Sequence, residues 1–330
     1  MTASPVEERG MKSNDVIMCE QSVGIGFSDT MPLSVALNYL REAGWTVGER
    51  NGYHTIGIGE ARPVALPLGR NASDDLPVNG HGLLRAVGRG GLDRDLALSV
   101  ATDVIVDEVM VGLNWTMVSA GSLTGIARSP DRGTQGARTV RDGEPIAGRP
   151  LRELALWICS LNPLRRSIGL AAVNAYWNRQ SGVPGGGPHE KGPWGFARFD
   201  APGEGLVIVG GFRGTLERLN RARVVEREPK GNDIPATKAP EALREAPAVA
   251  ITAQTLMNGS LEPLLHHAAG CPRVMLVGPS TPVAPILHAY GISEICGLGT
   301  TDPEQVAQFI KETGTMIALD SMTCQLGLVR

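Results

Sequence analysis

Short apolar runs separated by small polar turns dominate the last part of the chain. Five such runs, each of three to five residues, lie at 206–209, 223–225, 248–252, 274–277 and 294–298. Runs of this length without alternation are typical of strands buried on both faces of a parallel sheet. Helically spaced segments follow the last three runs and end at Gly270, Gly291 and Gly314. The pattern predicts a mainly parallel five-stranded sheet within residues 205–314.

Residues 104–178 show a different pattern of predicted elements. Strand-like segments at 104–113, 114–118 and 123–127 predict an antiparallel meander. Residues 150–160 and 163–178 carry apolar side chains at helical spacing. A meander followed by paired helices is typical of an α+β domain, so the chain combines two fold classes.

The first 82 residues form an N-terminal extension to which we assign no role. Residues 1–15 are polar and predict a disordered leader. A helix is expected at 31–43, and strands at 45–47 and 55–58 on either side of an Asn-Gly turn.

Composition narrows the classes of partner. The net charge is −3, charged residues make up 20% and aromatic residues 4% of the chain, so we expect no nucleic-acid partner. No apolar run approaches the length of a membrane span, so no membrane partner is expected. Five scattered cysteines without close pairs favour reduced thiols and a cytoplasmic location.

Candidate ligand contacts gather where strands give way to helices. In the segment RVMLVGPSTP (273–282), Ser280 and Thr281 read as caps of a helix that starts at Pro282. Asn258 reads as the cap of a helix over 261–269, and Asp302 precedes another. Carboxyl ends of neighbouring parallel strands share one edge of a sheet. These helix starts should therefore converge and offer N–H groups to an anionic or carbonyl oxygen, unless they are only caps.

A glycine-rich turn after the first strand leaves a second class of ligand open. Gly211 and Gly214 match the last two glycines of a dinucleotide fingerprint, but Val209 replaces the first. Glu226, near the end of the second strand, occupies the place where such folds often bind a ribose. An enzyme that uses S-adenosylmethionine or a dinucleotide is therefore the alternative, and tight backbone turns are the simpler explanation.

No catalytic or metal-ligating set can be assigned. Ser280 and Cys296 lack an identifiable base, so nucleophilic catalysis is not supported and enzymatic activity stays open. The adjacent His266 and His267 point about 100° apart on a helix, and with Cys271 they lack zinc-site spacing.

Four motifs together resemble the putative heavy-metal chelation family. They are VGLNWTMV (111–118), GLAAVNAYWN (169–178), TLMNGSLEPLL (255–265) and VGPSTPVAP (277–285). The resemblance covers about residues 83–314 and implies an enolase-N-terminal-like α+β domain at 83–200, followed by a Rossmann-like domain at 201–330. Residues 1–82 lie outside it.

The resemblance implies metal handling, with a heavy-metal ion, a metal chelate or another small anionic ligand bound in the cleft between the two domains. Assembly into a homo-oligomer is left open. Asn174 and Asn178 share one helix face and could reach such a cleft, or could simply bridge structural backbone. The candidate ligand-binding residues are Asn114, Trp115, Thr116, Asn174, Asn178, Gly210, Gly211, Phe212, Glu226, Thr255, Asn258, Gly278, Ser280, Thr281 and Asp302.

Overall fold

The computed structural model divides the chain into two compact units, Met1–Arg94 and Asp95–Arg330, which are described separately. Residues 82–83 and 201, where we expect the domain boundaries, lie outside the described residues. None of the described helices combines the length and the apolar character that a membrane crossing requires. The described residues are 30–42, 45–50, 53–58, 64–65, 71, 73–79, 91–131, 145–160, 162–179, 187–188, 196, 199–200, 202–212, 217–314 and 322–329.

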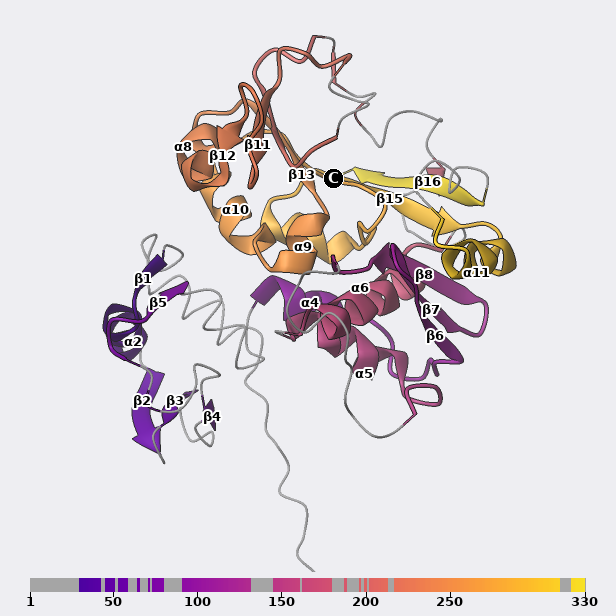
Figure 1. Cartoon of the computed structure of the whole chain (residues 1–330), viewed down its shortest axis with the longest axis horizontal. Helices are drawn as coiled ribbons and strands as arrows, with labels where there is room; N and C mark the ends of the chain where they lie inside the picture. Colours follow the sequence, from indigo (N-terminus) through magenta and orange to yellow (C-terminus); the bar gives the residue numbers. More distant parts are fainter. Residues whose placement is uncertain are drawn as a thin grey trace, which may run out of the picture. The chain divides into compact units, whose positions relative to one another are not determined.

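The described residues of the N-terminal unit form a helix and two small antiparallel sheets (Figure 1). The expected helix is present as α2 (Leu33–Glu42), and it buries Leu33, Ala36 and Leu37 because these residues share one face. The expected hairpin is present as β2 (Trp45–Arg50) and β3 (Tyr53–Ile58), to which β4 (Val64–Ala65) adds a third strand. β1 (Thr30–Pro32) pairs with β5 (Pro77–Asn79). The leader predicted for residues 1–15 lies outside the described residues.

The second unit begins with the expected meander, which we call, with its helices, the meander lobe (residues 95–179). Its strands β6 (Glu108–Val111), β7 (Trp115–Ala120) and β8 (Leu123–Arg128) are antiparallel. One sheet face packs on α6 (Pro163–Trp177), and Asn162 caps this helix through Leu164 N and Arg165 N. α4 (Gly91–Leu98) spans the boundary of the units, and α5 (Leu151–Ala155) continues as a 3₁₀ turn, η2 (Leu156–Cys159).

The sheet lobe (residues 187–329) contains an eight-stranded sheet in the order β12-β11-β10-β13-β14-β15-β16-β9. The first six strands are parallel, and β16 pairs antiparallel with both β15 and β9, which confirms the mainly parallel sheet. The central order β11-β10-β13-β14-β15 places the topological switch point between β10 and β13. The elements are β9 (Gly187–Pro188), β10 (Leu206–Val209), β11 (Arg223–Glu226), β12 (Ile234–Pro235), η4 (Ala236–Lys238), α8 (Ala239–Arg244), β13 (Ala248–Thr252), α9 (Gln254–Asn258), α10 (Leu261–His267), β14 (Val274–Val277), η5 (Pro285–Tyr290), β15 (Glu294–Thr300), α11 (Pro303–Lys311) and β16 (Thr323–Val329).

Two connections between strands differ from the expected alternation of strands and helices. No helix starts at Pro282: residues 281–284 form neither helix nor strand, and the short 3₁₀ helix η5 begins at Pro285. A long-range contact explains this, because Asn178 binds both Thr281 O and Val283 N and so holds this backbone outside a helix. The strand–helix pattern also predicts a short helix over 215–220 after β10, but residues 217–220 form turns, and residues 213–216 are not described.

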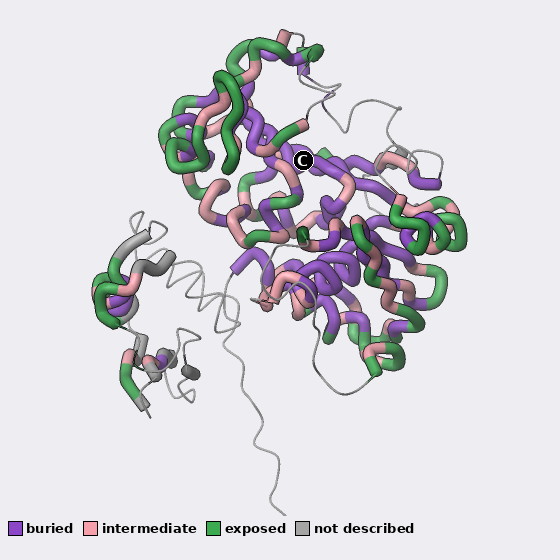
Figure 2. Tube along the Cα trace, in the orientation of Figure 1, coloured by how far each residue is buried: buried purple, intermediate pink, exposed green. Residues whose placement is uncertain are grey.

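The two lobes share a hydrophobic core (Figure 2). Trp115, Met117 and Ile126 of the meander pack with residues of β15 and α11, among them Leu298 and Phe309. A second cluster around Phe196 covers another part of the parallel sheet. The mixed α/β and α+β fold class is therefore confirmed, with the lobes joined by apolar packing.

Candidate functional site

Two asparagine side chains, at the end of α6 and just after it, connect the meander lobe to the sheet lobe by hydrogen bonds. Asn174 Nδ2 donates to Ser280 O at 3.1 Å and to Ile126 O at 2.7 Å. Asn178 Nδ2 donates to Thr281 O at 2.8 Å and to Leu298 O at 2.9 Å, and its Oδ1 accepts from Val283 N at 2.8 Å. We call Asn174, Asn178, Ser280 and Thr281 the closed seam, since each is at most 2% exposed.

Hydroxyl groups extend the closed seam into the meander lobe. Ser280 Oγ accepts from Arg128 N at 2.9 Å, so this hydroxyl binds backbone across the lobes instead of capping a helix. Thr116 Oγ1 accepts from Ser167 Oγ at 2.8 Å. Within the described residues, Asn174 Oδ1 and Thr281 Oγ1 are buried without a hydrogen-bond partner. The closed seam thus contains two oxygen atoms that an ordered water would satisfy, and little room for a larger ligand.

Several predicted site residues make structural contacts outside the closed seam. Asn114 Nδ2 donates to Thr313 O at 2.9 Å, and Asp302 caps α11 by accepting from Gln305 N at 2.9 Å. Asn258 does not cap α10; it ends α9 and accepts from Ser260 N at 3.0 Å. Thr255 Oγ1 donates to Thr252 O at 2.6 Å. Trp115 lies in the shared core, beneath the Arg128 guanidinium at 5.6 Å from its ring centre.

A second group of predicted residues meets at the switch point of the sheet, and its surface is accessible. We call Gly210, Gly211, Phe212, Glu226 and Thr252 the open edge. Gly210 has φ +106°, and a methyl group there would lie 2.6 Å from Thr252 Cγ2. Gly211 is exposed, and a methyl group there would lie 2.7 Å from Glu226 Oε1. The Glu226 carboxylate therefore stands beside the bare backbone of the turn that follows β10.

Side-chain packing and backbone hydrogen bonds hold the open edge in place. Phe212 packs edge-on against the buried Phe196 with ring centres 4.8 Å apart. Gly210 N donates to Val225 O at 3.0 Å, and Glu226 Oε2 accepts from Arg227 N at 3.1 Å. Gly278, also predicted, ends β14 at φ +124° beside Thr252 and is buried. The open edge is thus a preformed strip of backbone with one carboxylate and one hydroxyl.

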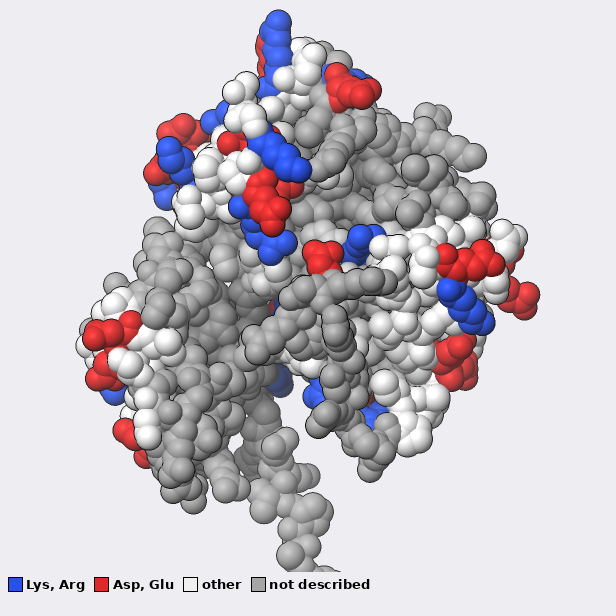
Figure 3. Space-filling model, in the orientation of Figure 1, with Lys and Arg blue, Asp and Glu red and all other residues white. Residues whose placement is uncertain are grey.

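Thr252 is the residue that the sequence analysis missed. It is the last residue of β13 and pairs in register with Val277 at the end of β14. Thr252 could have been predicted in the same way as Glu226, because it is the polar residue that ends the run at 248–252. Acidic and basic side chains are interspersed over the described surface in Figure 3, so charge alone does not locate a ligand site.

The donor set of the described residues does not fit a preformed metal centre. No group of three or more His, Cys, Asp or Glu residues in this part of the chain could hold an ion. Burial raises the pKa of the Cys271 thiol, and that of Cys324, which disfavours the thiolate that metals bind. Cys271 Sγ instead lies 3.2 Å from Arg273 O, to which it donates. A metal ion bound at the described residues would need most of its ligands from other groups.

Two family models match this chain, and both are described as putative heavy-metal chelation. One matches residues 94–177, essentially the meander lobe, and the other residues 197–326, the sheet lobe. The chain belongs to this family. Residues 1–93 lie outside both matches. A search of curated proteins finds no match.

Solved structures of the DUF364 family share the fold of this member. A protein from Desulfitobacterium hafniense DCB-2 is 24% identical with a TM-score of 0.63, and the match covers 72% of this chain and 98% of that one. A protein from Pyrococcus horikoshii is 18% identical with a TM-score of 0.61 and the same coverage. Both are described as having unknown function, so they support the architecture alone.

Proposed function

We propose that this protein binds a small organic ligand at the open edge, with Glu226 as the anchoring group. In a family described as putative heavy-metal chelation, the first choice for that ligand is a metal chelate. The observation that carries the proposal is the position of Glu226 Oε1 over the side-chain-free face of Gly211. A ligand can approach the backbone there while the carboxylate reaches it from the side.

The chemistry of the open edge suits an organic carrier of metal better than a bare ion. A carboxylate can accept a hydrogen bond from a hydroxyl or amine of a chelator, or give one oxygen ligand to the chelated metal. The chelator then supplies the remaining ligands, which the described residues do not offer. The switch point between β10 and β13 is also where ligands bind in open α/β sheets.

The meander lobe borders the proposed site through α9, the helix that follows β13. α6 contacts α9, and the buried Arg166 Nε donates to Leu256 O at 2.6 Å. A ligand on the open edge would therefore lie beside an element that the other lobe holds in place. This supports a ligand position near the junction of the lobes, as the family resemblance implies.

A second candidate is a nucleoside-type cofactor. Glu226 is the last residue of β11, directly beside the glycine turn after β10, which is where related folds bind a ribose. Residues 217–220 form turns, so the described part of this connection offers no helix N-terminus to a pyrophosphate. The geometry therefore favours S-adenosylmethionine over a dinucleotide, and it assigns no catalytic residue.

Native mass spectrometry of protein purified from cells, with elemental analysis of the same sample, tests these proposals. A co-purifying mass with stoichiometric metal supports a chelate, and a nucleoside mass without metal supports the second candidate. Calorimetry then compares nickel–citrate, free Ni²⁺ and S-adenosylhomocysteine as probes. Free Ni²⁺ binding more tightly than either organic probe would contradict both candidates.

A charge-neutral variant locates the site. Glu226→Gln should weaken binding of the preferred probe by roughly tenfold or more, because it removes a charge-assisted hydrogen bond. Glu228→Gln is the matched control, since this exposed glutamate lies outside the open edge. Equal affinities for the two variants would place the ligand elsewhere.

A further inference from the structure

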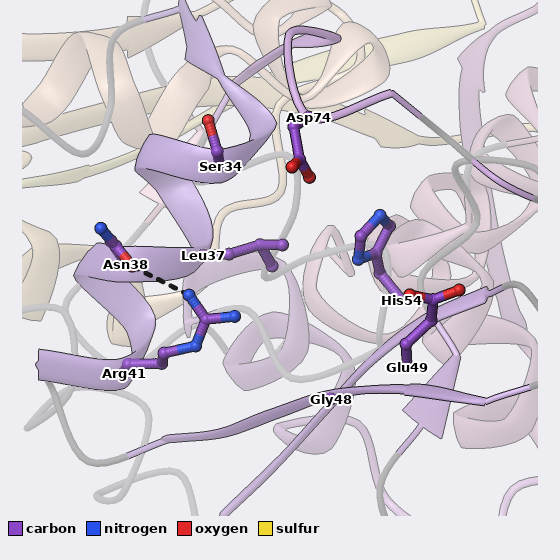
Figure 4. Close-up of a pocket in the computed structure, with 8 residues that line it drawn as sticks. All are labelled: Ser34, Leu37, Asn38, Arg41, Gly48, Glu49, His54 and Asp74. Carbon is purple, nitrogen blue, oxygen red and sulfur yellow. Dashed lines mark hydrogen bonds between the residues drawn. The ribbon is translucent and has the colours of Figure 1, made fainter.

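The N-terminal unit, which neither family model matches, contains a pocket of about 360 Å³. α2, the β2–β3 hairpin and the segment before β5 line it (Figure 4). This volume is at the small end of the range of protein ligand sites and suits a molecule the size of an amino acid. The pocket is independent of the open edge, which belongs to the other unit.

One wall of the pocket is a single face of α2. Ser34, Leu37, Asn38 and Arg41 line it at positions i, i+3, i+4 and i+7, which share one side of a helix. Leu37 is 3% exposed and forms an apolar floor. Arg41 Nη1 donates to Asn38 Oδ1 at 2.8 Å, so the amide steadies the guanidinium with one of its five N–H donors.

The opposite wall carries acidic groups. Glu49 and His54 are paired residues of β2 and β3, and Figure 4 shows their side chains next to each other, across from Asn38 and Arg41. Asp74 lies near the beginning of α2, because Ser34 N donates to Asp74 O at 2.9 Å. Arg41 is two turns further on, about 10 Å along the helix axis. The pocket is therefore bipolar, with a guanidinium at one end and a carboxylate at the other.

The charged side chains that line the pocket define which ligand would complement it. A zwitterion satisfies Arg41 and one carboxylate, and the remaining carboxylate, which lies beside His54 in the lining of the same pocket, can accept a second cation. The described residues form no cluster of His, Cys, Asp and Glu that could hold a metal ion, so an organic ammonium group is the better match. A diamine would leave Arg41 without an anion, and a dicarboxylic acid would repel Glu49 or Asp74.

We propose that this pocket binds a dibasic amino acid. Its carboxylate contacts Arg41 and Asn38, one ammonium group contacts Asp74 and the other contacts Glu49, while Leu37 supports the aliphatic chain. Because Arg41, Glu49 and Asp74 are exposed, their attraction for the ligand is screened, and we expect an affinity between micromolar and millimolar.

Calorimetry on the full chain with L-lysine as the probe tests the assignment. L-lysine should bind, whereas cadaverine, which lacks the carboxylate, and 6-aminohexanoate, which lacks the α-ammonium, should each bind roughly tenfold more weakly or worse. Arg41→Met and Asp74→Asn should each reduce lysine affinity by about the same factor. Asp75→Asn is the matched control, because this neighbouring carboxylate is exposed and does not line the pocket.

Several outcomes would overturn the proposal. They are the lack of binding at millimolar lysine, equal affinity for 6-aminohexanoate, equal losses in Asp74→Asn and Asp75→Asn, and Zn²⁺ binding that lysine cannot displace. Circular dichroism checks that each variant is folded; if Arg41→Met is not, Arg41→Lys replaces it and should lose the paired N–H donors but keep the charge. Glu226→Gln should leave lysine binding unchanged, so this site and the open edge stand or fall separately.

Discussion

The closed seam and the open edge lie at the carboxyl ends of strands in one sheet, yet they use their polar groups in opposite ways. In the closed seam, the side-chain amides of Asn174 and Asn178 bind the backbone of residues 280–283. At the open edge, the Glu226 carboxylate lies beside exposed backbone. Polar residues lie near strand ends in both places. A polar residue is a candidate binding contact only where its side chain or the neighbouring backbone is accessible to solvent.

The difference arises from what covers each strand end. Asn174 in α6 binds Ser280 O and Asn178, the residue after α6, binds Thr281 O in the loop after β14 and Leu298 O in β15. Buried backbone groups must find partners, so polar residues in this position stabilise the fold. The ends of β10 and β11 carry Gly211 and the partly exposed Glu226. Substitutions in the two regions should therefore separate stability from binding.

The largest effect is expected for Gly297→Ala in β15. A methyl group at this position would lie 2.3 Å from Thr281 O, a backbone atom that the closed seam holds in place. We expect a loss of about 4 kcal/mol in the free energy of unfolding, since backbone must shift and the Asn178 bonds break. Thermal unfolding measures it, with Gly270→Ala as control because nothing lies within 4 Å there. If Gly297→Ala were as stable as the control, the backbone of the closed seam could shift at little cost in free energy.

The next largest effect is expected for Asn178→Ala. The substitution leaves Thr281 O, Leu298 O and Val283 N buried without their partner. Each unsatisfied group costs about 1–3 kcal/mol, which water entering the vacated space partly offsets, so we expect a net loss of about 3 kcal/mol. Urea unfolding compares the variant with Asn220→Ala, an exposed site. If ligand binding at the open edge falls while stability does not, Asn178 is a binding residue and the comparison fails.

Gly211→Ala should weaken ligand binding and leave stability nearly unchanged, the reverse of what we expect for Asn178→Ala. Its methyl group would meet Glu226 Oε1 at 2.7 Å, but this is the end of a flexible side chain that can swing away. We expect a stability change below about 1 kcal/mol. Affinity for the probe that the wild type prefers should fall by roughly tenfold or more, because carboxylate and backbone can no longer reach it together. A large drop in melting temperature would show that the open edge is as tightly packed as the seam.

Local patterns in the sequence were sufficient for the meander and for the five strands β10, β11, β13, β14 and β15, whereas β9, β12 and β16 were not predicted. The runs at 206–209 and 274–277 match β10 and β14, and α11 begins directly after Asp302, where a helix was predicted. Apolar runs and caps depend on neighbouring residues, which is why they can be read without a structure. The open-edge residues Gly210, Gly211 and Glu226 followed from the same strand-end reasoning.

Long-range contacts explain the errors. Ser280 and Thr281 have the local chemistry of helix caps, but Asn178, about a hundred positions earlier, takes the backbone instead. Ser280 Oγ likewise binds Arg128 N in the other lobe. Neither partner can be identified from spacing along one sequence. The distinction between seam and edge also depends on which strand ends α6 covers, a property of tertiary packing.

The smallest effect concerns the Cys324 thiol, which can report whether the seam opens. A methyl group on Gly299 would lie 3.3 Å from Cys324 Sγ and 2.8 Å from Asn178 O, so this thiol borders the seam. Burial raises the pKa of Cys324, so folding disfavours the thiolate. The thiol therefore contributes fully to the free energy of unfolding below the unfolded thiol pKa of about 8.5, and this contribution is lost as pH rises through the folded pKa.

At pH 8 the wild-type thiol of Cys324 should therefore react more slowly with iodoacetamide than in the unfolded chain. Asn178→Ala should accelerate the reaction several-fold by admitting water, whereas Gly211→Ala should leave it unchanged. Peptide mapping by mass spectrometry gives the rate at Cys324, with Cys271, whose pKa burial also raises, as the internal reference. Equal acceleration at both cysteines would indicate loosening of the whole sheet lobe, and the seam would then not be a separate structural element.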